Sequence, residues 1–205
     1  YLFVNELSNV LNKNSIIIGD TGSHLTWLMQ GFKIKYGQVM FSAFGNSPMG
    51  YALPASIGAQ IINKKKKVIS FNGDGSIQLN VQELQTLSKL NLPIKIIIMN
   101  NHGYGIIQQF QDLYLSKRHE ASNRVVSNPN FKFLSKAFKI NYNFIKKNSD
   151  IRKIKKIINS NKAEIIEVDI EDKEKIMPKL EFGKPIDNLS PQINLNLIKN
   201  YLSTN

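Results

Sequence analysis

Short apolar runs rich in β-branched residues alternate along this chain with longer segments of helical periodicity, and this alternation limits the fold more than any other feature. Strands are predicted at 15–20, 67–72, 94–100, 142–145 and 163–170. Helices are predicted at 24–30, 54–62, 77–90, 130–138 and 150–159. Apolar strands that are separated by helices are typical of a parallel sheet covered on both faces. The sequence therefore predicts an α/β domain with a doubly wound, mostly parallel sheet and helices on both faces.

The alternation ends near residue 170, which predicts two parts of different character. Residues 1–170 would form the α/β domain, and residues 171–205 a tail with three prolines that packs on the domain or on a neighbour. The first residue is Tyr1 rather than Met, which is compatible with a chain excised from a longer protein.

Composition and charge exclude several classes of protein. The chain has no cysteine, so a disulfide framework and thiolate metal sites are excluded. The apolar run at 94–99 is far too short to cross a bilayer, and we expect a cytoplasmic protein without a membrane partner. The net charge is +12, and residues 131–162 hold ten Lys or Arg against the single acid Asp150. Because the aromatic residues there fall at helical core spacing, this stretch predicts a solvated face rather than a nucleic-acid surface.

Glycine, acid and amide residues gather where three predicted strands end, in the motifs "GDTGSH", "GDGS" and "NNHGYG". Ligands of open parallel sheets bind at this edge. Gly73 and Gly75 allow a tight turn, Asp74 offers a hard oxygen ligand, and Asn101 offers an amide oxygen from the adjacent strand. A cation held by one carboxylate and one amide keeps much of its charge. It would therefore favour a diphosphate, as would the N–H groups of a helix that starts after Gly75.

Each motif has a plain structural reading, because Gly-Asp-Gly is a common turn and Asn-Asn commonly ends a strand. Their combination is more specific. Gly-Asp-Gly, then 24 residues, then Asn-Asn resembles the thiamine diphosphate motif of the thiamine-dependent enzymes. The segments "GDTGSHLTW", "GNSPMGYALPASIGAQ", "NNHGYGIIQQFQDLY" and "MPKLEFGKPIDNLSP" extend the resemblance to the acetolactate synthase-like group, from about Leu2 to Pro191.

The resemblance implies thiamine diphosphate and Mg²⁺ as cofactors. It implies metal binding by the side chains of Asp74 and Asn101 and by the carbonyl of Gly103. Met49 would act as an apolar wedge that bends the cofactor, although core packing is the plain reading of an isolated Met. For His24 the plain reading is a solvent-facing helix residue. The implied cofactor-binding residues are Gly22, Ser23, His24, Ser47, Met49, Gly73, Gly75, Ser76, Tyr104 and Gly105.

The resemblance also implies a reaction class, a carboligation that uses a 2-oxo acid as donor, with pyruvate expected. Simple decarboxylases of this superfamily often carry a glutamate where this chain has Ile107, so an apolar pocket favours attack on an acceptor. Phe110 stands where acetolactate synthases commonly have a tryptophan that contacts the acceptor. Two alternatives remain open: a 2-oxo acid decarboxylase without ligation, and a non-catalytic cofactor-binding or regulatory module.

Only the diphosphate-binding, carboxyl-terminal third of such enzymes is matched. The glutamate that activates the cofactor is expected in a pyrimidine-binding domain of the same or another subunit, so no catalytic residue is assigned here. The resemblance further implies a homodimer or homotetramer, FAD bound through an absent domain as a possibility, and a fragment that is inactive alone.

Overall fold

A computed structural model describes residues 1–123, 127–192 and 196. The chain divides into two compact units, Tyr1–Glu174 and Lys175–Asn205, which are described separately. Within the described residues, the first unit holds a six-stranded sheet in the order β2-β1-β3-β4-β6-β5, and every neighbouring pair is parallel. The strands are β1 (Ser15–Gly19), β2 (Val39–Phe41), β3 (Lys67–Gly73), β4 (Lys95–Asn100), β5 (Asn141–Ile145) and β6 (Glu164–Asp169).

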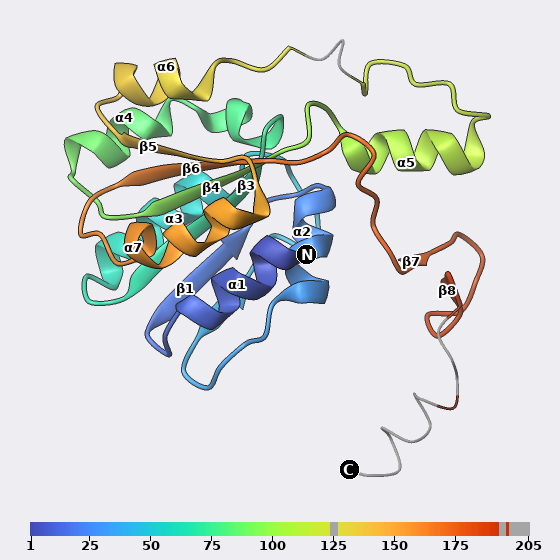
Figure 1. Ribbon diagram of the computed structural model, residues 1–205, viewed down its shortest axis with the longest axis horizontal. Coiled ribbons are helices and arrows are strands. Elements are labelled where there is room, and N and C mark those ends of the chain that lie inside the picture. The colour runs from blue at the N-terminus through green and yellow to red at the C-terminus, as the bar shows by residue number, and fades with distance from the viewer. Residues whose placement is uncertain (124–126, 193–195, 197–205) are drawn as a thin grey trace. The chain divides into compact units, whose positions relative to one another are not determined.

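Helices cover both faces of this sheet (Figure 1). On one face α3 (Ala52–Ile62), α4 (Glu83–Lys89) and α6 (Phe131–Ala137) share one apolar cluster with the strands. On the other face α1 (Leu2–Val10) contacts α2 (Ser23–Gly31) and α7 (Ile154–Ile158). The prediction of a doubly wound parallel sheet is confirmed.

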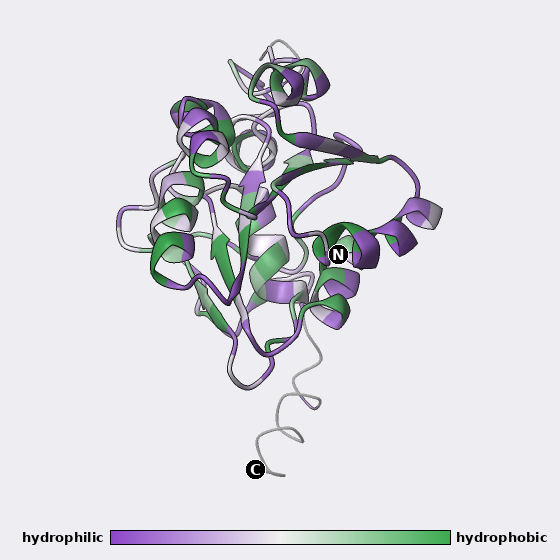
Figure 2. Ribbon diagram, turned by 90° about the vertical axis from the view of Figure 1, so that its left-hand side faces the viewer, coloured by the Kyte–Doolittle hydropathy of each residue, from purple (hydrophilic) through white to green (hydrophobic). Residues whose placement is uncertain are grey.

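The alternation of side chains along the strands builds both layers of the core. Ile16 and Ile18 of β1 belong to the cluster under α3, whereas Ile17, which lies between them, must point to the opposite face. All three are buried, and burial of each such side chain contributes about 1.5–3 kcal/mol. Figure 2 shows the result, with hydrophobic strands in the centre and helices that are hydrophilic on one side.

Two predicted helices are interrupted in the structure. The segment 77–90 divides into the 3-10 helix η1 (Ser76–Asn80) and α4, and the segment 150–159 into the 3-10 helix η2 (Asn148–Lys153) and α7. In η1 the side chain of Ser76 accepts a hydrogen bond from the backbone N–H of Gly73, at 3.0 Å. Gln78 donates to the carbonyl of Asp74, at 3.1 Å. These contacts hold the chain in a tight turn after β3, and a regular α-helix begins only at Glu83.

The second unit contains a two-stranded antiparallel sheet of β7 (Lys179–Leu180) and β8 (Leu189–Ser190). Residues 193–195 and 197–205 of the predicted tail lie outside the described residues. The predicted division at residue 170 and the packing of the tail stay predictions. None of the helices in the described part of the chain is both long and apolar enough to cross a lipid bilayer.

Candidate functional site

The strand order places a crevice at the carboxyl ends of β1 and β3. The chain runs from β1 outward to β2 on one side, and through β3 and β4 on the other, so the direction of winding reverses between β1 and β3. In doubly wound sheets ligands bind at this point of reversal, outside the carboxyl ends of the strands. The loops that follow β1, β3 and β4 carry the three motifs singled out in the sequence.

A cavity of about 430 Å³ lies at this edge. It brings together every predicted site residue except Ser47 and Phe110. Its lining comprises Thr21, Gly22, Ser23, His24, Met49, Gly73, Asp74, Gly75, Ser76, Leu79, Asn101, Gly103, Tyr104, Gly105, Ile106 and Ile107.

Ser47 and Phe110 lie outside that lining. Ser47 is exposed in the turn before Met49, with a positive φ of 45° and its backbone N–H bonded to the carbonyl of Ala43 at 2.7 Å. Phe110 is half-buried on α5 (Gly105–Tyr114), where its ring centroid lies 5.0 Å from that of Tyr114. The predicted contacts of these two residues with cofactor and acceptor stay predictions.

Asp74 is 2% exposed and lines the cavity, in the turn after β3. Its Oδ2 accepts a hydrogen bond from the backbone N–H of Gly103, at 3.0 Å, so Gly103 already lies beside the predicted metal ligand. Burial raises the pKa of Asp74, because removing water disfavours the charged form, although the hydrogen bonds that the carboxylate accepts act in the opposite direction. A cation beside the carboxylate would reverse that effect.

Asn101 faces the same cavity from the end of β4, and its side chain is not satisfied. Its Nδ2 is buried and has no hydrogen-bond partner among the described residues. Oxygen and nitrogen of such an amide exchange places by a half-turn, so the buried end can be the oxygen that a cation needs. Gly105 makes room for this amide, since a Cβ at Gly105 would lie 2.4 Å from Asn101 Nδ2.

His24 is buried, at 5% exposure, in the first turn of α2 and does not face solvent. The imidazole packs over the turn after β3 so closely that a Cβ on Gly73 would lie 2.7 Å from its Nδ1. Burial lowers the pKa of His24 to about 3, so the ring is neutral at physiological pH. Its Nε2 is buried with no partner in the described part of the chain, which leaves one polar atom free for a ligand.

Two residues that organise the site were not found from the sequence. The first is Asp20, which is fully buried after β1. Its carboxylate accepts hydrogen bonds from the backbone N–H groups of Gly50 and Ala52, both at 2.9 Å. These bonds fix the turn that carries Met49 and the start of α3. "GDTGSH" contained this acid, but its distant backbone partners could not be read from the motif.

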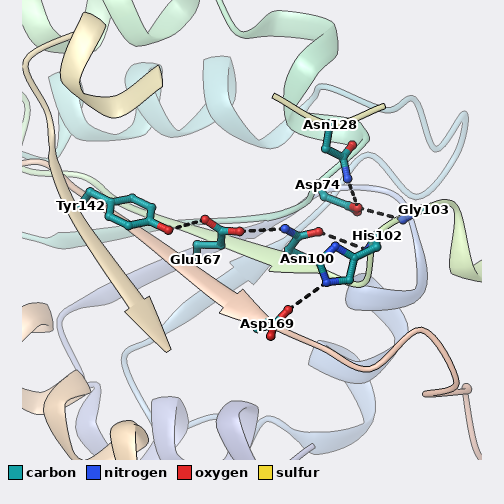
Figure 3. A network of polar contacts seen from close by, with 8 residues as sticks. All are labelled: Asp74, Asn100, His102, Gly103, Asn128, Tyr142, Glu167 and Asp169. Carbon is teal, nitrogen blue, oxygen red and sulfur yellow. Dashed lines mark hydrogen bonds and ion pairs between the residues drawn. The ribbon is translucent and has the colours of Figure 1, made fainter. Parts of the chain in front are cut away.

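The second is Asn128, which lies in the loop before α6. Its Nδ2 donates to Asp74 Oδ2 at 2.6 Å, and its Oδ1 accepts from Gln78 at 2.9 Å. Figure 3 shows the carboxylate of Asp74 between Asn128 and Gly103. These two donors hold Oδ2 and thereby orient the carboxylate of Asp74.

These observations fit a cation that carries a phosphorylated ligand. The described residues contain no cluster of three or more His, Cys, Asp or Glu, so a protein cage made of charged ligands is not seen there. One buried carboxylate and one unsatisfied amide, in a cavity lined by glycines, instead suit Mg²⁺ whose remaining ligands are phosphate oxygens.

Comparison with known proteins assigns most of this chain to one family. The family model described as thiamine pyrophosphate enzyme, C-terminal TPP binding domain, matches residues 20–168. The chain is similar to the acetolactate synthase large subunit of Cyanidium caldarium, with 34% identity over 182 residues, which cover 88% of this chain and 31% of that protein. It is also similar to the acetolactate synthase large subunit of Lactococcus lactis, with 32% identity over 176 residues, which cover 86% of this chain and 30% of that protein. The chain thus spans about a third of the length of these curated relatives.

Proposed function

The chain belongs to the family of thiamine pyrophosphate enzyme C-terminal TPP binding domains, as an acetolactate synthase-like member, and we propose that it binds the diphosphate end of thiamine diphosphate through Mg²⁺. The observation that carries this proposal is the pair of Asp74 and Asn101. A buried carboxylate and an unsatisfied buried amide line one cavity from the ends of neighbouring strands.

We assign the cation to Asp74, Asn101 and the backbone of Gly103. Asp74 supplies the charge, and Asn101 supplies a neutral oxygen that leaves the cation free to attract an anion. Asn128 and the N–H of Gly103 hold Asp74 Oδ2, which orients the carboxylate. Such partners of a metal ligand fix its direction.

The diphosphate would lie along the loops after β1 and β3. Gly22, Gly73 and Gly75 line that side of the cavity and carry no side chain, so phosphate oxygens would approach the backbone there closely. Ser23 and Ser76 add hydroxyl groups. His24 would line the diphosphate as a neutral ring. Since the ring donates to the backbone carbonyl of Asp20 while Nε2 has no partner among the described residues, Nδ1 carries the proton, and Nε2 is a hydrogen-bond acceptor that would meet phosphate through a donor such as water.

The remainder of the cofactor would lie against apolar side chains. Met49, Tyr104 and Ile107 line the cavity beside the glycines, where they orient the cofactor and exclude water. When bound, thiamine diphosphate supplies a carbon that adds to the carbonyl of a 2-oxo acid and accepts the electron pair released with carbon dioxide. Ile107 offers no proton beside that centre, which favours carboligation, with pyruvate as donor, over simple decarboxylation.

The proposed enzyme needs a second domain. The chain spans about a third of its relatives, whose names describe large subunits of acetolactate synthase. We propose that a pyrimidine-binding domain of the same or another subunit closes the cavity and supplies the activating glutamate, within a homodimer or homotetramer. FAD would bind outside this chain. A decarboxylase without ligation and a non-catalytic cofactor-binding module are the alternative functions.

A carbon dioxide release assay tests the proposal. The 205-residue chain, given pyruvate, thiamine diphosphate and Mg²⁺, should show no turnover, because half of the cofactor's walls and the activating acid are absent. Addition of the pyrimidine-binding domain, as one chain or in trans, should give turnover. Substantial activity of the chain alone would mean that one of its own acids, with Glu83 the first to replace, activates the cofactor.

A further inference from the structure

A buried glutamate lies one strand away from the site and has no part in the function proposed so far. Glu167 on β6 is 9% exposed, and no ion pair is seen for it among the described residues. Its carboxylate accepts two hydrogen bonds instead. Oε1 accepts from Nδ2 of Asn100 on β4, at 2.7 Å, and Oε2 accepts from the hydroxyl of Tyr142 on β5, at 2.5 Å.

These two bonds fix the direction of the Asn100 side chain. A carboxylate can only accept, so the NH₂ group of Asn100 must face Glu167. Its oxygen then faces the other way and accepts from the backbone N–H of His102, at 3.1 Å. Burial and, to a smaller degree, the hydrogen bond to Glu167 raise the pKa of Tyr142. Its hydroxyl therefore stays protonated and donates to Oε2 of Glu167.

The side chain of Asn100 shapes the loop that carries the proposed metal ligands. The bond to His102 spans two residues and closes a turn in which His102 has a positive φ of 60°. A non-glycine residue adopts that conformation at some energetic cost, and a side chain that bonds to the backbone offsets it. The next residue, Gly103, then directs its N–H at Asp74. Figure 3 shows this path from Tyr142 to Asp74.

We propose that Glu167 is a positioning residue for the cation site: by fixing the amide of Asn100 it holds the 101–103 loop in the form that presents Asn101 and Gly103 to Asp74. The proposal rests on the proposed function. It predicts that the hydrogen-bonding ability of Glu167 matters for Mg²⁺ binding, although Glu167 is no ligand of the metal.

The same strand provides a matched control. Glu164, at the opposite end of β6, is 6% exposed and also accepts two side-chain hydrogen bonds, from Asn141 at 3.2 Å and from Asn143 at 2.9 Å. Glu167→Leu and Glu164→Leu therefore each remove one buried carboxylate and leave two donors without an acceptor. They differ in that Glu167 lies next to the metal loop, whereas Glu164 lies near the charge of the buried Lys95.

The test measures the Mg²⁺ concentration that half-saturates thiamine diphosphate binding to the chain assembled with its pyrimidine-binding domain. Glu167→Leu should raise this concentration about 10-fold, the lower end of the cost of losing a direct partner of a metal ligand, because Glu167 acts through Asn100 and bonds to no ligand itself. Glu164→Leu should leave it close to the wild-type value. Glu167→Gln should also stay close, because its oxygen can accept from Asn100 while its NH₂ donates to the hydroxyl of Tyr142.

Three results would overturn the proposal. Equal shifts in Glu167→Leu and Glu164→Leu would indicate a general loss of stability. No shift in Glu167→Leu would show that the loop does not depend on this contact. A loss in Glu167→Gln as large as in Glu167→Leu would mean that the charge of Glu167 acts on the cation directly.

Hydrogen exchange of the metal-free 205-residue chain separates this inference from the proposed function. The amides of His102 and Gly103 should exchange faster in Glu167→Leu than in Glu164→Leu, and unchanged exchange would overturn the positioning role. A wild-type protein that holds the loop but binds thiamine diphosphate without Mg²⁺ would instead overturn the proposed function, and with it the metal role of Glu167.

Discussion

The buried imidazole of His24 should make the stability of this chain depend on pH in a defined direction. The pKa of His24 is about 3 in the folded protein, against 6.5 for an exposed imidazole. Below pH 6.5 the unfolded chain takes up a proton that the folded chain refuses, so protonation favours unfolding. The contribution of His24 is therefore present above pH 6.5 and is lost progressively as the pH falls toward 3.

The size of the effect follows from the gap between the two pKa values. Each pH unit between the two pKa values changes the free energy of unfolding by about 1.4 kcal/mol. A change from neutral pH to about pH 4.5 should therefore lower the free energy of unfolding by about 2.7 kcal/mol. Asp20 and Asp74 act in the opposite direction, because burial raises the pKa of both carboxyl groups and their protonation stabilises the fold. A comparison with a variant that lacks only the imidazole cancels their contribution.

Urea unfolding of wild type and His24→Gln at neutral pH and at about pH 4.5 measures this difference. The fluorescence of Trp27, the single tryptophan and 2% exposed, reports unfolding. The free-energy difference between wild type and variant should shift by about 2.7 kcal/mol in favour of the variant at the lower pH. The same difference at both pH values would show that His24 titrates as an exposed histidine, and the neutral state of its buried ring would be refuted.

Two further substitutions test the proposed metal ligand Asn101 and the predicted acceptor contact of Phe110. Gly105→Ala places a Cβ 2.4 Å from Asn101 Nδ2, so calorimetry should show that Mg²⁺-dependent binding of thiamine diphosphate is weakened about 10-fold or more. The control Gly58→Ala, inside α3 with no atom near its Cβ, should leave this binding unchanged and add up to about 1 kcal/mol of stability. Equal binding in both variants would contradict the assignment of Asn101. Phe110→Ala should alter the ratio of products formed from competing acceptors more than it alters donor decarboxylation, whereas Leu113→Ala, at an exposed position of α5, should alter neither. Parallel losses in both activities of Phe110→Ala would indicate a packing role, at a cost below the roughly 3–5 kcal/mol of a fully buried Phe.

Much of the fold was predictable because its central strands are buried on both faces. The strands β3 and β4 are mostly apolar, and each differs from its predicted bounds by one residue at one end. The edge strand β2 has three residues, with Val39 exposed, and gave no such signal. The helix α1 was not predicted, although Phe3, Val4 and Leu7 are buried at helical spacing. The 3-10 helix η1 could not be predicted, because its form depends on side chains that bind the backbone of a neighbouring turn.

The candidate site was predictable where its residues fall within one motif. The positions of Asp74 and Asn101 after adjacent strands predicted that they lie together, since the carboxyl ends of adjacent parallel strands meet at one edge, and both line one cavity. Gly103 was implied by the family resemblance. Asn128 and Glu167 act across 54 and 67 residues of sequence, on Asp74 and Asn100. Such partners depend on how loops and strands pack in three dimensions, and no local pattern marks them.

Calorimetric titration of thiamine diphosphate into the chain assembled with its pyrimidine-binding domain tests the metal site most directly. We expect binding in the presence of Mg²⁺, no measurable binding after chelation, and none in Asp74→Ala, because a diphosphate without a counter-charge is costly to bury. Asp74→Asn, which keeps the shape of the side chain, should fold and likewise fail to bind. Equal affinity in Asp74→Ala and wild type, or an affinity that chelation does not change, would contradict the assignment of this cavity to a magnesium-held diphosphate.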